Sequence, residues 1–245
     1  RYQEFAPAPP LQDTVAAFWK FTVLDPASRE HTVVPDGAVN IVWARGAAIL
    51  VGPRNTALRV PVTPHWDYWG IRLMPGVART LIPIHVPATR EQAAPLHFTA
   101  PQAAAEFVAA MQQVPGVPAL ESVVQSWLER AQPPDPLVQE FTRRIIAANG
   151  IAPIHSLCGG LSISYRQLLR RFHRDVGMTP KEFSRLRRIR WACLQALESG
   201  ESWARISAGS GFADQSHLSR EFTGVFGWPP ELVKEYLRRI DHHLV

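Results

Sequence analysis

Four hydrogen-bonding side chains follow a glycine break near the end of the chain, where residues 211–222 read GFADQSHLSREF. They are Gln215, Ser216, His217 and Arg220. Side chains of these types pair with base edges or phosphate oxygens when a helix presents them at its N-terminal end. Only Leu218 and Phe222, four residues apart, share a face that such a helix would bury. The stretch is typical of a helix that offers most of its surface to a partner, and these side chains suit nucleic acid.

An upstream stretch repeats this pattern at an offset of 50 residues. The aligned pairs are Leu168 with Leu218, Phe172 with Phe222, Gly177 with Gly227 and Pro180 with Pro230. The outward positions of the first copy are Tyr165, Arg166, Leu169 and Arg170. A plain polar helix face would explain one such stretch, but two copies in register favour a pair of DNA-reading helices.

The elements that must hold these side chains follow from the same spacing. We expect recognition helices over about Ser164–Arg174 and Gln215–Val225, each capped by the residue that precedes its first turn. A joining helix is expected over about Pro180–Leu197. Four basic residues of that helix are expected on its solvated face or against the DNA backbone: Lys181, Arg185, Arg187 and Arg188.

The charge of the chain favours a polyanionic partner for its C-terminal part alone. The 245 residues carry a net charge of +5 with a pI of about 9.7. Residues 136–245 hold 16 Lys and Arg against 10 Asp and Glu, whereas residues 1–135 hold 10 against 11. Two cysteines are too few for a disulfide framework, and we find no membrane-length apolar run and no signal-peptide pattern. We expect a cytoplasmic protein that does not associate with a membrane.

A proline-rich segment divides the chain. Three prolines fall within residues 133–136, where they remove backbone donors and disfavour helix. We expect residues 1–131 to form one domain, 132–136 a linker and 137–245 an all-helical second domain. The first domain should be a small β barrel or curled sheet with helices, which makes the whole chain α+β. Its expected strands are 38–43, 47–51, 57–60 and 67–74, and its expected helices are 101–111 and 119–131.

The C-terminal pattern resembles the DNA-binding domain of the AraC/XylS family of bacterial transcription regulators. The second copy matches through Ile206, the whole of 211–222, Gly227 and Pro230. The first copy matches through Leu157, Leu161, Ser164, Arg166, Leu168, Arg170, Phe172, Gly177, Thr179 and Pro180. The resemblance implies two helix-turn-helix units joined by a long helix. A joining helix of about 18 residues would hold the two recognition helices about 27 Å apart, so we expect an operator of two boxes about one helical turn apart. A homodimer and RNA polymerase are the further partners expected. Gly159 and Gly160 depart from it and should weaken the first scaffold helix by about 1 kcal/mol each.

The N-terminal part resembles, more loosely, an uncharacterised segment that precedes this domain in some members of the family. The residues that carry the likeness are Trp19, Pro35-Asp36-Gly37, Gly52, Ile71-Arg72 and Pro75-Gly76. In better-known relatives this position holds a barrel that binds a small effector or a second subunit. The resemblance therefore implies a sensor or dimerisation domain.

Aromatic residues are abundant in this N-terminal part. The candidate effector-binding residues are Trp19, Trp43, Tyr68 and Arg72. An aromatic pocket with one arginine would suit a small acidic or aromatic ligand. Strand alternation over residues 67–74 places Tyr68 and Arg72 on one face and Trp69 on the other. The alternative, that these aromatic residues only fill a small core, stays open.

Catalysis is the competing function. No two of the histidines at 31, 65, 85 and 97 are spaced as a close ligand pair, and both cysteines lie in helical patterns of the other domain. We find neither a glycine-rich phosphate loop nor a nucleophile elbow. We therefore expect no catalytic residue, no metal site, no cofactor and no enzyme activity. The alternative is a ligand-binding or metal-dependent barrel enzyme that the DNA-binding domain merely localises.

Overall fold

A six-stranded antiparallel sheet forms the centre of the N-terminal part in the computed structural model, which describes residues 1–240. Its strand order is β1-β2-β7-β4-β5-β8. The strands are β1 (Tyr2–Phe5), β2 (Val15–Thr22), β4 (Asn40–Ala44), β5 (Ala47–Val51), β7 (Asp67–Leu73) and β8 (Ala93–Pro95). The end strands β1 and β8 do not pair with one another, so the sheet is open. The expected α+β class is confirmed, with a curled sheet in place of the alternative closed barrel.

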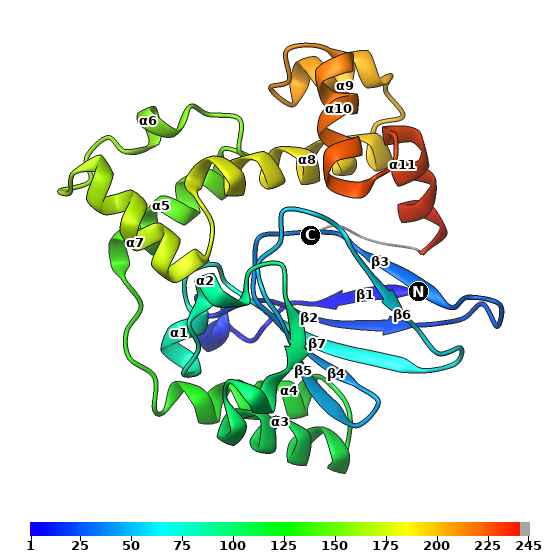
Figure 1. Ribbon diagram of the computed structural model, residues 1–245, viewed down its shortest axis with the longest axis vertical. Coiled ribbons are helices and arrows are strands. Elements are labelled where there is room, and N and C mark those ends of the chain that lie inside the picture. Colours follow the sequence, from blue (N-terminus) through cyan, green and yellow to red (C-terminus); the bar gives the residue numbers. More distant parts are fainter. Residues whose placement is uncertain (241–245) are drawn as a thin grey trace.

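Side chains alternate between the two faces of this sheet. On β7, Trp69, Ile71 and Leu73 pack into the main core, whereas Tyr68 and Arg72 lie on the opposite face, as the alternation predicts. The main core is covered by two helices, α3 (Pro101–Gln113) and α4 (Val117–Leu128), which lie below the sheet in Figure 1. Each fully buried Phe or Leu in this layer contributes about 2 kcal/mol by leaving water.

A second, two-stranded sheet stands over the other face. It pairs β3 (Glu30–Val33) with β6 (Leu58–Pro61) and has no strand in common with the large sheet. We call it the β3–β6 ribbon. Figure 1 shows it between the large sheet and the C-terminal helix α11 (Pro230–Arg239). Short helices α1 (Ala78–Leu81) and α2 (Val86–Thr89) and the 3-10 turns Pro9–Leu11 and Leu96–Phe98 complete this part.

The proline-rich segment lies between α4 and the first C-terminal helix, α5 (Pro136–Ala147). Asp135 caps α5 by accepting a hydrogen bond from the backbone N–H of Leu137 (3.1 Å). The buried hydrophobic residues on the two sides of this segment form separate clusters: a large one between Leu11 and Trp127 and a small one around Tyr2 and Tyr68 before it, and one between Val138 and Leu237 after it. Division into independent domains at residues 132–136 stays a prediction.

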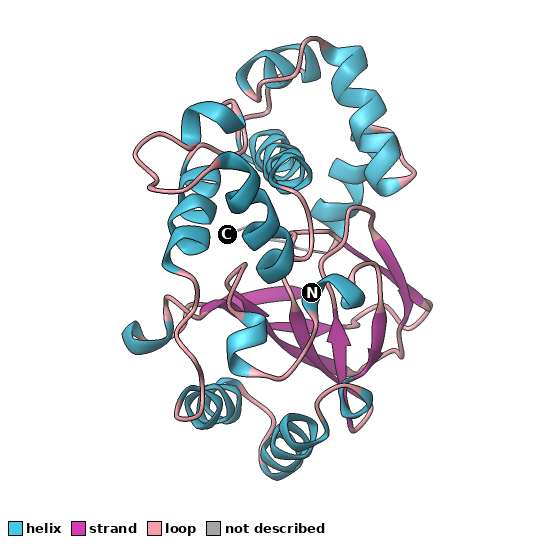
Figure 2. Cartoon of the chain, turned by 60° about the vertical axis from the view of Figure 1, so that its left-hand side comes forward, coloured by secondary structure: helices cyan, strands magenta, loops and turns pink. Residues whose placement is uncertain are grey.

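Two helical units follow, joined by one long helix. The first contains α6 (Ile154–Leu157) and α7 (Tyr165–Val176), and the second contains α9 (Trp203–Gly209) and α10 (Gln215–Phe226). The joining helix α8 (Pro180–Glu198) has 19 residues and crosses above the sheet (Figure 1). Figure 2 shows helices on both sides of the strands, the C-terminal units above and α3 and α4 below. No helix within residues 1–240 combines the length and hydropathy that crossing a bilayer requires.

Candidate nucleic-acid interface and interior cavity

Helix α7 presents the first group of candidate DNA-binding residues. Ser164 caps it in a capping box with Gln167, which satisfies the first backbone donors of the helix. Leu168 and Phe172 are buried beneath, so Arg166 and Arg170 are left exposed on the outer surface and Leu169 is partly buried. Within residues 1–240, neither arginine side chain makes a hydrogen bond or an ion pair. Both guanidinium groups are available to a ligand.

Helix α10 presents the second group in the same geometry. Asp214 caps it by accepting from the backbone N–H of His217 (2.7 Å). Gln215 and Ser216 are exposed in the first turn. Arg220 is exposed one turn later, and its Nε donates to the backbone carbonyl of Ser216 (3.3 Å). Arg220 is thus exposed in the N-terminal half of the helix with its Nε held by the helix backbone.

His217 differs from its neighbours because its ring turns back onto the helix-turn-helix turn. Its Nδ1 accepts a hydrogen bond from the backbone N–H of Ala213 (3.2 Å), and Nε2 lies 3.6 Å from a carboxylate oxygen of Glu221. The ring meets that of Phe212 edge-on, with centroids 5.6 Å apart. His217 therefore closes the turn that orients α10, and only its exposed edge is offered to a partner.

The two units end in the same way, which confirms the repeat. Helices α7 and α10 both have 12 residues and both terminate at a left-handed glycine, Gly177 at φ 80° and Gly227 at φ 71°. A residue with a side chain is strained in this conformation, so glycine ends each helix at the corresponding position. Pro180 and Pro230 then begin α8 and α11.

The scaffold helices of the two units are unequal. Helix α6 has four residues and buries none of them, whereas α9 has seven and buries Ile206 and Ser207. The first helix stops before Gly159 and Gly160, as the cost of glycine in a helix predicts. Arg144 of α5 holds the irregular segment that follows by donating to the carbonyls of Leu157 (3.0 Å) and Gly159 (2.6 Å).

Three basic residues of α8 are partly buried and not on a solvated face, so that part of the expectation was wrong for them, while contact with the DNA backbone stays a prediction. Arg185 pairs with Glu221 of α10, and Arg188 donates to the carbonyl of Gly211 (3.2 Å) while its guanidinium lies 5.3 Å from the ring centre of Phe212. Arg187 turns toward the N-terminal part, where burial lowers its pKa to about 10. Lys181 alone of the four stays exposed. Arg185 and Arg188 are three residues apart, so they share a helix face and fix the second unit to α8.

An interior cavity of about 360 Å³ lies on the Tyr68 face of the large sheet. Its walls are mainly apolar and come from the sheet, the β3–β6 ribbon and α8. Trp19 lies flat across Gly70 and donates from its indole nitrogen to the side-chain oxygen of Asn40 (3.2 Å). The size is within the range of small-molecule sites, and the lining suits an apolar ligand.

Arg72 stands at the polar end of this cavity within a network of acidic groups. Its guanidinium contacts Glu4 (2.7 Å), Asp36 (2.6 Å) and the hydroxyl of Tyr2 (2.9 Å). Burial acts to lower the pKa of Arg72, but these three neighbours together raise it above the usual arginine value. Arg72 is therefore a fixed structural cation, and the network holds the N-terminal strand to the sheet.

Arg190 of α8 reaches the same cavity from the C-terminal part. It is 6% exposed, and burial, together with the charge of Arg72, lowers its pKa in spite of the opposite charges of Asp36 and Glu4. The lining thus includes a buried cation from the helix that joins the two helical units. In the sequence, Arg190 is marked only by its position in the predicted joining helix, and that position does not indicate that its side chain lines a cavity.

Comparison with known domains decides what the C-terminal units are. Residues 157–238 match the family described as "Helix-turn-helix domain". They are an AraC-type helix-turn-helix domain. Residues 3–95 match the "Domain of unknown function (DUF6597)". No curated protein matches the chain.

Solved structures of ToxT from Vibrio cholerae resemble the whole chain at low identity. One at 1.65 Å resolution is 13% identical, with a TM-score of 0.46 over 97% of this chain and 98% of that one. ToxT bound to (E)-4-(8-methylnaphthalen-1-yl)but-3-enoic acid is 13% identical, with a TM-score of 0.44 over 98% of each chain. Wild-type ToxT with a bound unsaturated fatty acid is 11% identical, with a TM-score of 0.41 over 89% of this chain and 90% of that one.

The candidate effector residues divide between the two faces of the sheet that precedes the helix-turn-helix domain. Trp19, Tyr68 and Arg72 line the cavity. Trp43 lies on the opposite face, where its ring packs 6.4 Å from that of Phe107 on α3. Sequence reasoning missed Arg190 and the ribbon residues as parts of the lining. Within residues 1–240, no three His, Cys, Asp or Glu side chains are grouped so that they could hold a metal ion.

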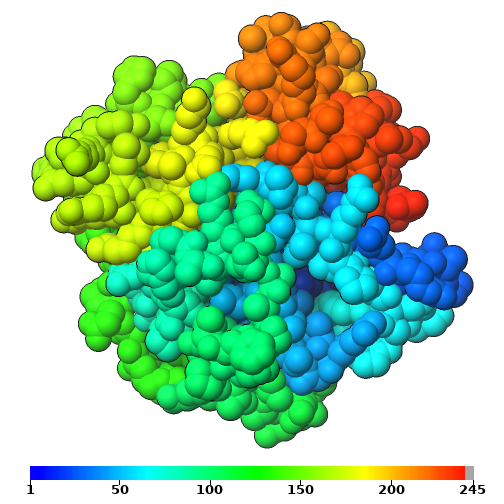
Figure 3. All heavy atoms as spheres, in the orientation of Figure 1, coloured from blue at the N-terminus to red at the C-terminus, as the bar shows by residue number. Residues whose placement is uncertain are grey.

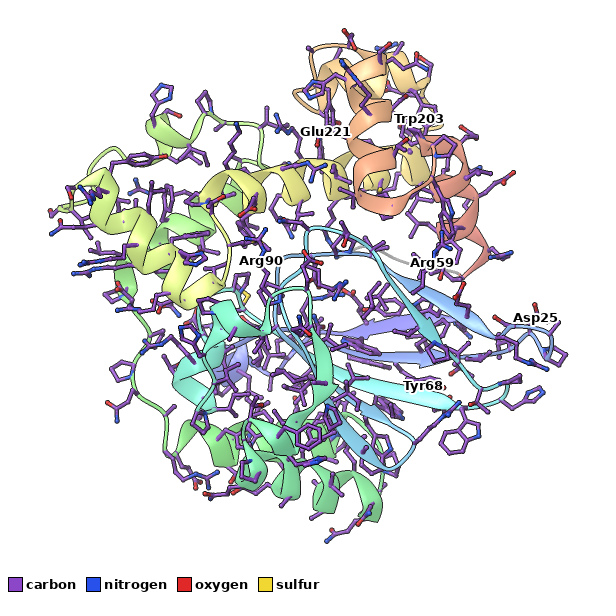
Figure 4. All side chains as sticks on the ribbon, viewed as in Figure 1. Asp25, Arg59, Tyr68, Arg90, Trp203 and Glu221 are labelled. Atoms are coloured by element: carbon purple, nitrogen blue, oxygen red, sulfur yellow. The ribbon has the colours of Figure 1, made fainter. Side chains whose placement is uncertain are left out.

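The helix-turn-helix domain packs directly on the N-terminal part. Phe183 of α8 lies against Gly37, where an added Cβ would approach its ring to 2.7 Å. Glu182 pairs with Arg90 (2.6 Å), whose side chain lies beneath α8 in Figure 4. The space-filling view shows the C-terminal segments seated against the N-terminal ones with little space between them (Figure 3). These contacts place the DNA-binding helices and the cavity in one framework.

Proposed function

We propose that this protein is a sequence-specific DNA-binding transcription regulator whose binding responds to a small ligand in the interior cavity. The observation that carries the proposal is the pair of 12-residue helices α7 and α10, alike in capping and termination and both exposed in their N-terminal halves. They belong to units joined by α8, which is about 28 Å long at 1.5 Å per residue. Adjacent major-groove segments on one face of B-DNA recur every ~34 Å. One subunit with modestly bent DNA therefore reads two boxes about one turn apart.

The residues proposed to contact DNA are the exposed ones on these helices. Arg166 and Arg170 of α7, and Arg220 of α10, suit bidentate contact with guanine. Gln215 and Ser216 suit adenine or phosphate oxygens. Leu169 offers an apolar contact to a thymine methyl group, and His217 acts mainly by orienting its helix. A bound regulator would stand near RNA polymerase, and subunits on neighbouring sites would form a homodimer.

The proposed effector is a small, mainly apolar molecule with an acidic group. The apolar walls supply most of the buried contact, as is usual for small-molecule sites. The guanidinium of Arg190 lowers the cost of bringing a negative charge into this interior. The acidic group is proposed to lie at the polar end of the cavity, which Arg72 and Arg190 share.

Selection from random DNA with the full chain tests the DNA-binding function. We expect enriched sequences that contain two short boxes about one helical turn apart, and an affinity that falls steeply with salt because bound phosphates release counterions. Footprinting of one enriched duplex should show two protected segments on one face. Enrichment of no sequence, or of a single box, would contradict the two-groove geometry.

Binding of 1-anilinonaphthalene-8-sulfonate, an apolar anion, tests the effector site. We expect its fluorescence to rise with the native protein and the melting temperature to increase, because a probe that binds the native cavity stabilises the folded state. Val42→Trp, on the cavity face of β4, should abolish both effects by filling the space. Ala16→Trp, at an exposed position of β2, is the control and should leave them unchanged.

A further inference from the structure

The β3–β6 ribbon has one face toward the cavity. His31 and Val33 of β3 and Leu58 and Val60 of β6 line it, and their register pairs them directly as His31 with Val60 and Val33 with Leu58. Paired residues of an antiparallel ribbon share a face. The residues between them, Thr32 and Arg59, are also paired and therefore lie on the opposite face.

The ribbon is fastened to the second helix-turn-helix unit at the edge of β3, through the ring of His31 and through Arg59 on the opposite face. The hydroxyl of Tyr236 on α11 accepts a hydrogen bond from the backbone N–H of Thr32 (2.7 Å) and lies 2.6 Å from Nδ1 of His31. The guanidinium of Arg59 lies 5.2 Å from the ring centre of Trp228, in the turn between α10 and α11. Figure 4 shows Arg59 at the base of α11.

A third tie reaches the recognition helix itself. The backbone N–H of Ala57, one residue before β6, donates to the carbonyl of Val225 (2.8 Å) in the last turn of α10. The last carbonyls of a helix have no partner within the helix. The ribbon therefore completes the C-terminal end of the second DNA-reading helix.

The first unit is fastened to different parts of the N-terminal domain. Arg79 of α1 pairs with Asp175 of α7 (3.4 Å), and Gly177 packs against Pro53 and Val86. The ribbon is a separate two-stranded sheet, and a sheet of this size is marginally stable without the surfaces on its two faces. A change on its cavity face is thus transmitted directly to α10 and α11.

We propose that the β3–β6 ribbon couples occupancy of the cavity to the second helix-turn-helix unit, so that a ligand changes the affinity for one operator box and leaves the other unaltered. A ligand that contacts Val33, Leu58 and Val60 alters the position and order of the ribbon. The ties at Thr32, Arg59 and Ala57 pass this change to α10. The inference rests on the proposed function, because it requires both a cavity ligand and two-box DNA.

The test uses the full chain, the selected two-box DNA and 1-anilinonaphthalene-8-sulfonate as the probe. Dissociation constants are measured with far-red-labelled duplexes that carry both boxes, the first box alone or the second box alone. The second box is the one at which Arg220→Ala relaxes specificity. For the wild type, we expect the saturating probe to change second-box affinity by about fivefold or more and first-box affinity by less than about twofold.

The uncoupling variant is Arg59→Ala with Tyr236→Phe, which removes two ties and replaces no lining residue; the contact between the Tyr236 hydroxyl and His31 is lost with the second tie. Its second-box response to the probe should fall below about twofold, while its probe fluorescence titration stays that of the wild type. Arg79→Ala is the matched control, because it cuts a tie to the first unit, and its second-box response should persist. If the double variant does not fold, Arg59→Ala alone, at an exposed position, should reduce the response by at least half.

Equal responses at both boxes, or a full response in the uncoupling variant, would overturn the coupling. Probe binding with no change at either box would do the same while leaving the effector site standing. Fluorescence that Val42→Trp does not suppress would overturn the effector site and the coupling together. Failure to enrich any DNA would instead overturn the DNA-binding function, so the failures are distinguishable.

Discussion

Trp19 lies across Gly70 because that position has no side chain. The two residues are register partners on β2 and β7, and a Cβ on Gly70 would stand 2.2 Å from the indole ring. The ring is thereby held flat as the floor of the cavity, with its nitrogen bonded to Asn40. A glycine in a central strand, which weakens the strand itself, is explained by this close approach.

Gly70→Ala should displace Trp19 and destabilise the protein by about 1–3 kcal/mol, the usual cost of overpacking. Urea denaturation followed by tryptophan fluorescence measures the loss, and the native emission spectrum should shift as the ring moves. Gly209→Ala in α9 is the matched control, since a Cβ there meets no atom within 4 Å. It should leave stability unchanged or raise it by about 1 kcal/mol.

Arg220→Ala and Arg170→Ala should each weaken binding by about 1–3 kcal/mol and relax specificity in one box only, a different box for each. Quantitative binding to duplexes with single-base changes in each box provides the measurement. Arg238→Ala, an exposed arginine of α11, should alter neither box selectively. A uniform loss across all sequences in both variants would show that the two arginines hold phosphate.

Glu182 makes the contact between α8 and the N-terminal part sensitive to acid. Burial alone would raise its pKa, but hydrogen bonds from the Thr179 backbone and from Arg90 lower it to about 2. Because the unfolded carboxyl titrates near 4.5, the stability from this group is complete above pH 4.5 and is lost as the pH falls toward 2.

Glu182→Gln keeps the capping-box contact with Thr179 but loses the ion pair with Arg90. It should cost about 1 kcal/mol at neutral pH and flatten the stability profile between pH 4.5 and 2. The measurement is the melting temperature of each variant between pH 4.5 and 2. Glu198→Gln, at an exposed position, is the control and should keep the wild-type profile.

His31 should make the ribbon less stable in mild acid. Burial lowers its pKa to about 4 from the usual 6.5. The unfolded chain then takes up a proton before the folded one does, so stability falls as the pH drops from 6.5 toward 4, by about 1–3 kcal/mol in total. His31→Asn keeps a hydrogen-bond acceptor near Tyr236 without titrating. The urea midpoint of unfolding is measured at several pH values. Its fall between pH 6.5 and 4 should disappear in His31→Asn and persist in the control variant His65→Asn, because the side chain of His65 is exposed.

The C-terminal fold could be predicted because its signals are local. The spacing of Leu168 and Phe172, repeated 50 residues later, and the glycine and proline that follow fix helix ends within one or two residues. Strand β3, four residues reading EHTV, carries no such pattern, and its position depends on pairing with β6, which is distant in the sequence.

The placement of side chains also depends on contacts between residues that are distant in the sequence. Trp43 pairs with Trp69, so it belongs to the core face, but that register is not visible in either strand alone. The sequence predicted a solvated Arg187, because Asp36 and Arg72, which lie near it in the fold, are far from it in the sequence.

The four-residue length of α6 has a consequence for the DNA that this protein would recognise. Its unit relies on an irregular segment held by Arg144, where the other unit has a seven-residue helix. Directional hydrogen bonds discriminate between bases only as sharply as the scaffold fixes the donors. The DNA box read by α7 should therefore tolerate more base substitutions than the box read by α10. Across a genome, functional sites would accumulate substitutions in that box while the box read by α10 stays nearly invariant, and the boundary between the two would be visible in the promoters themselves.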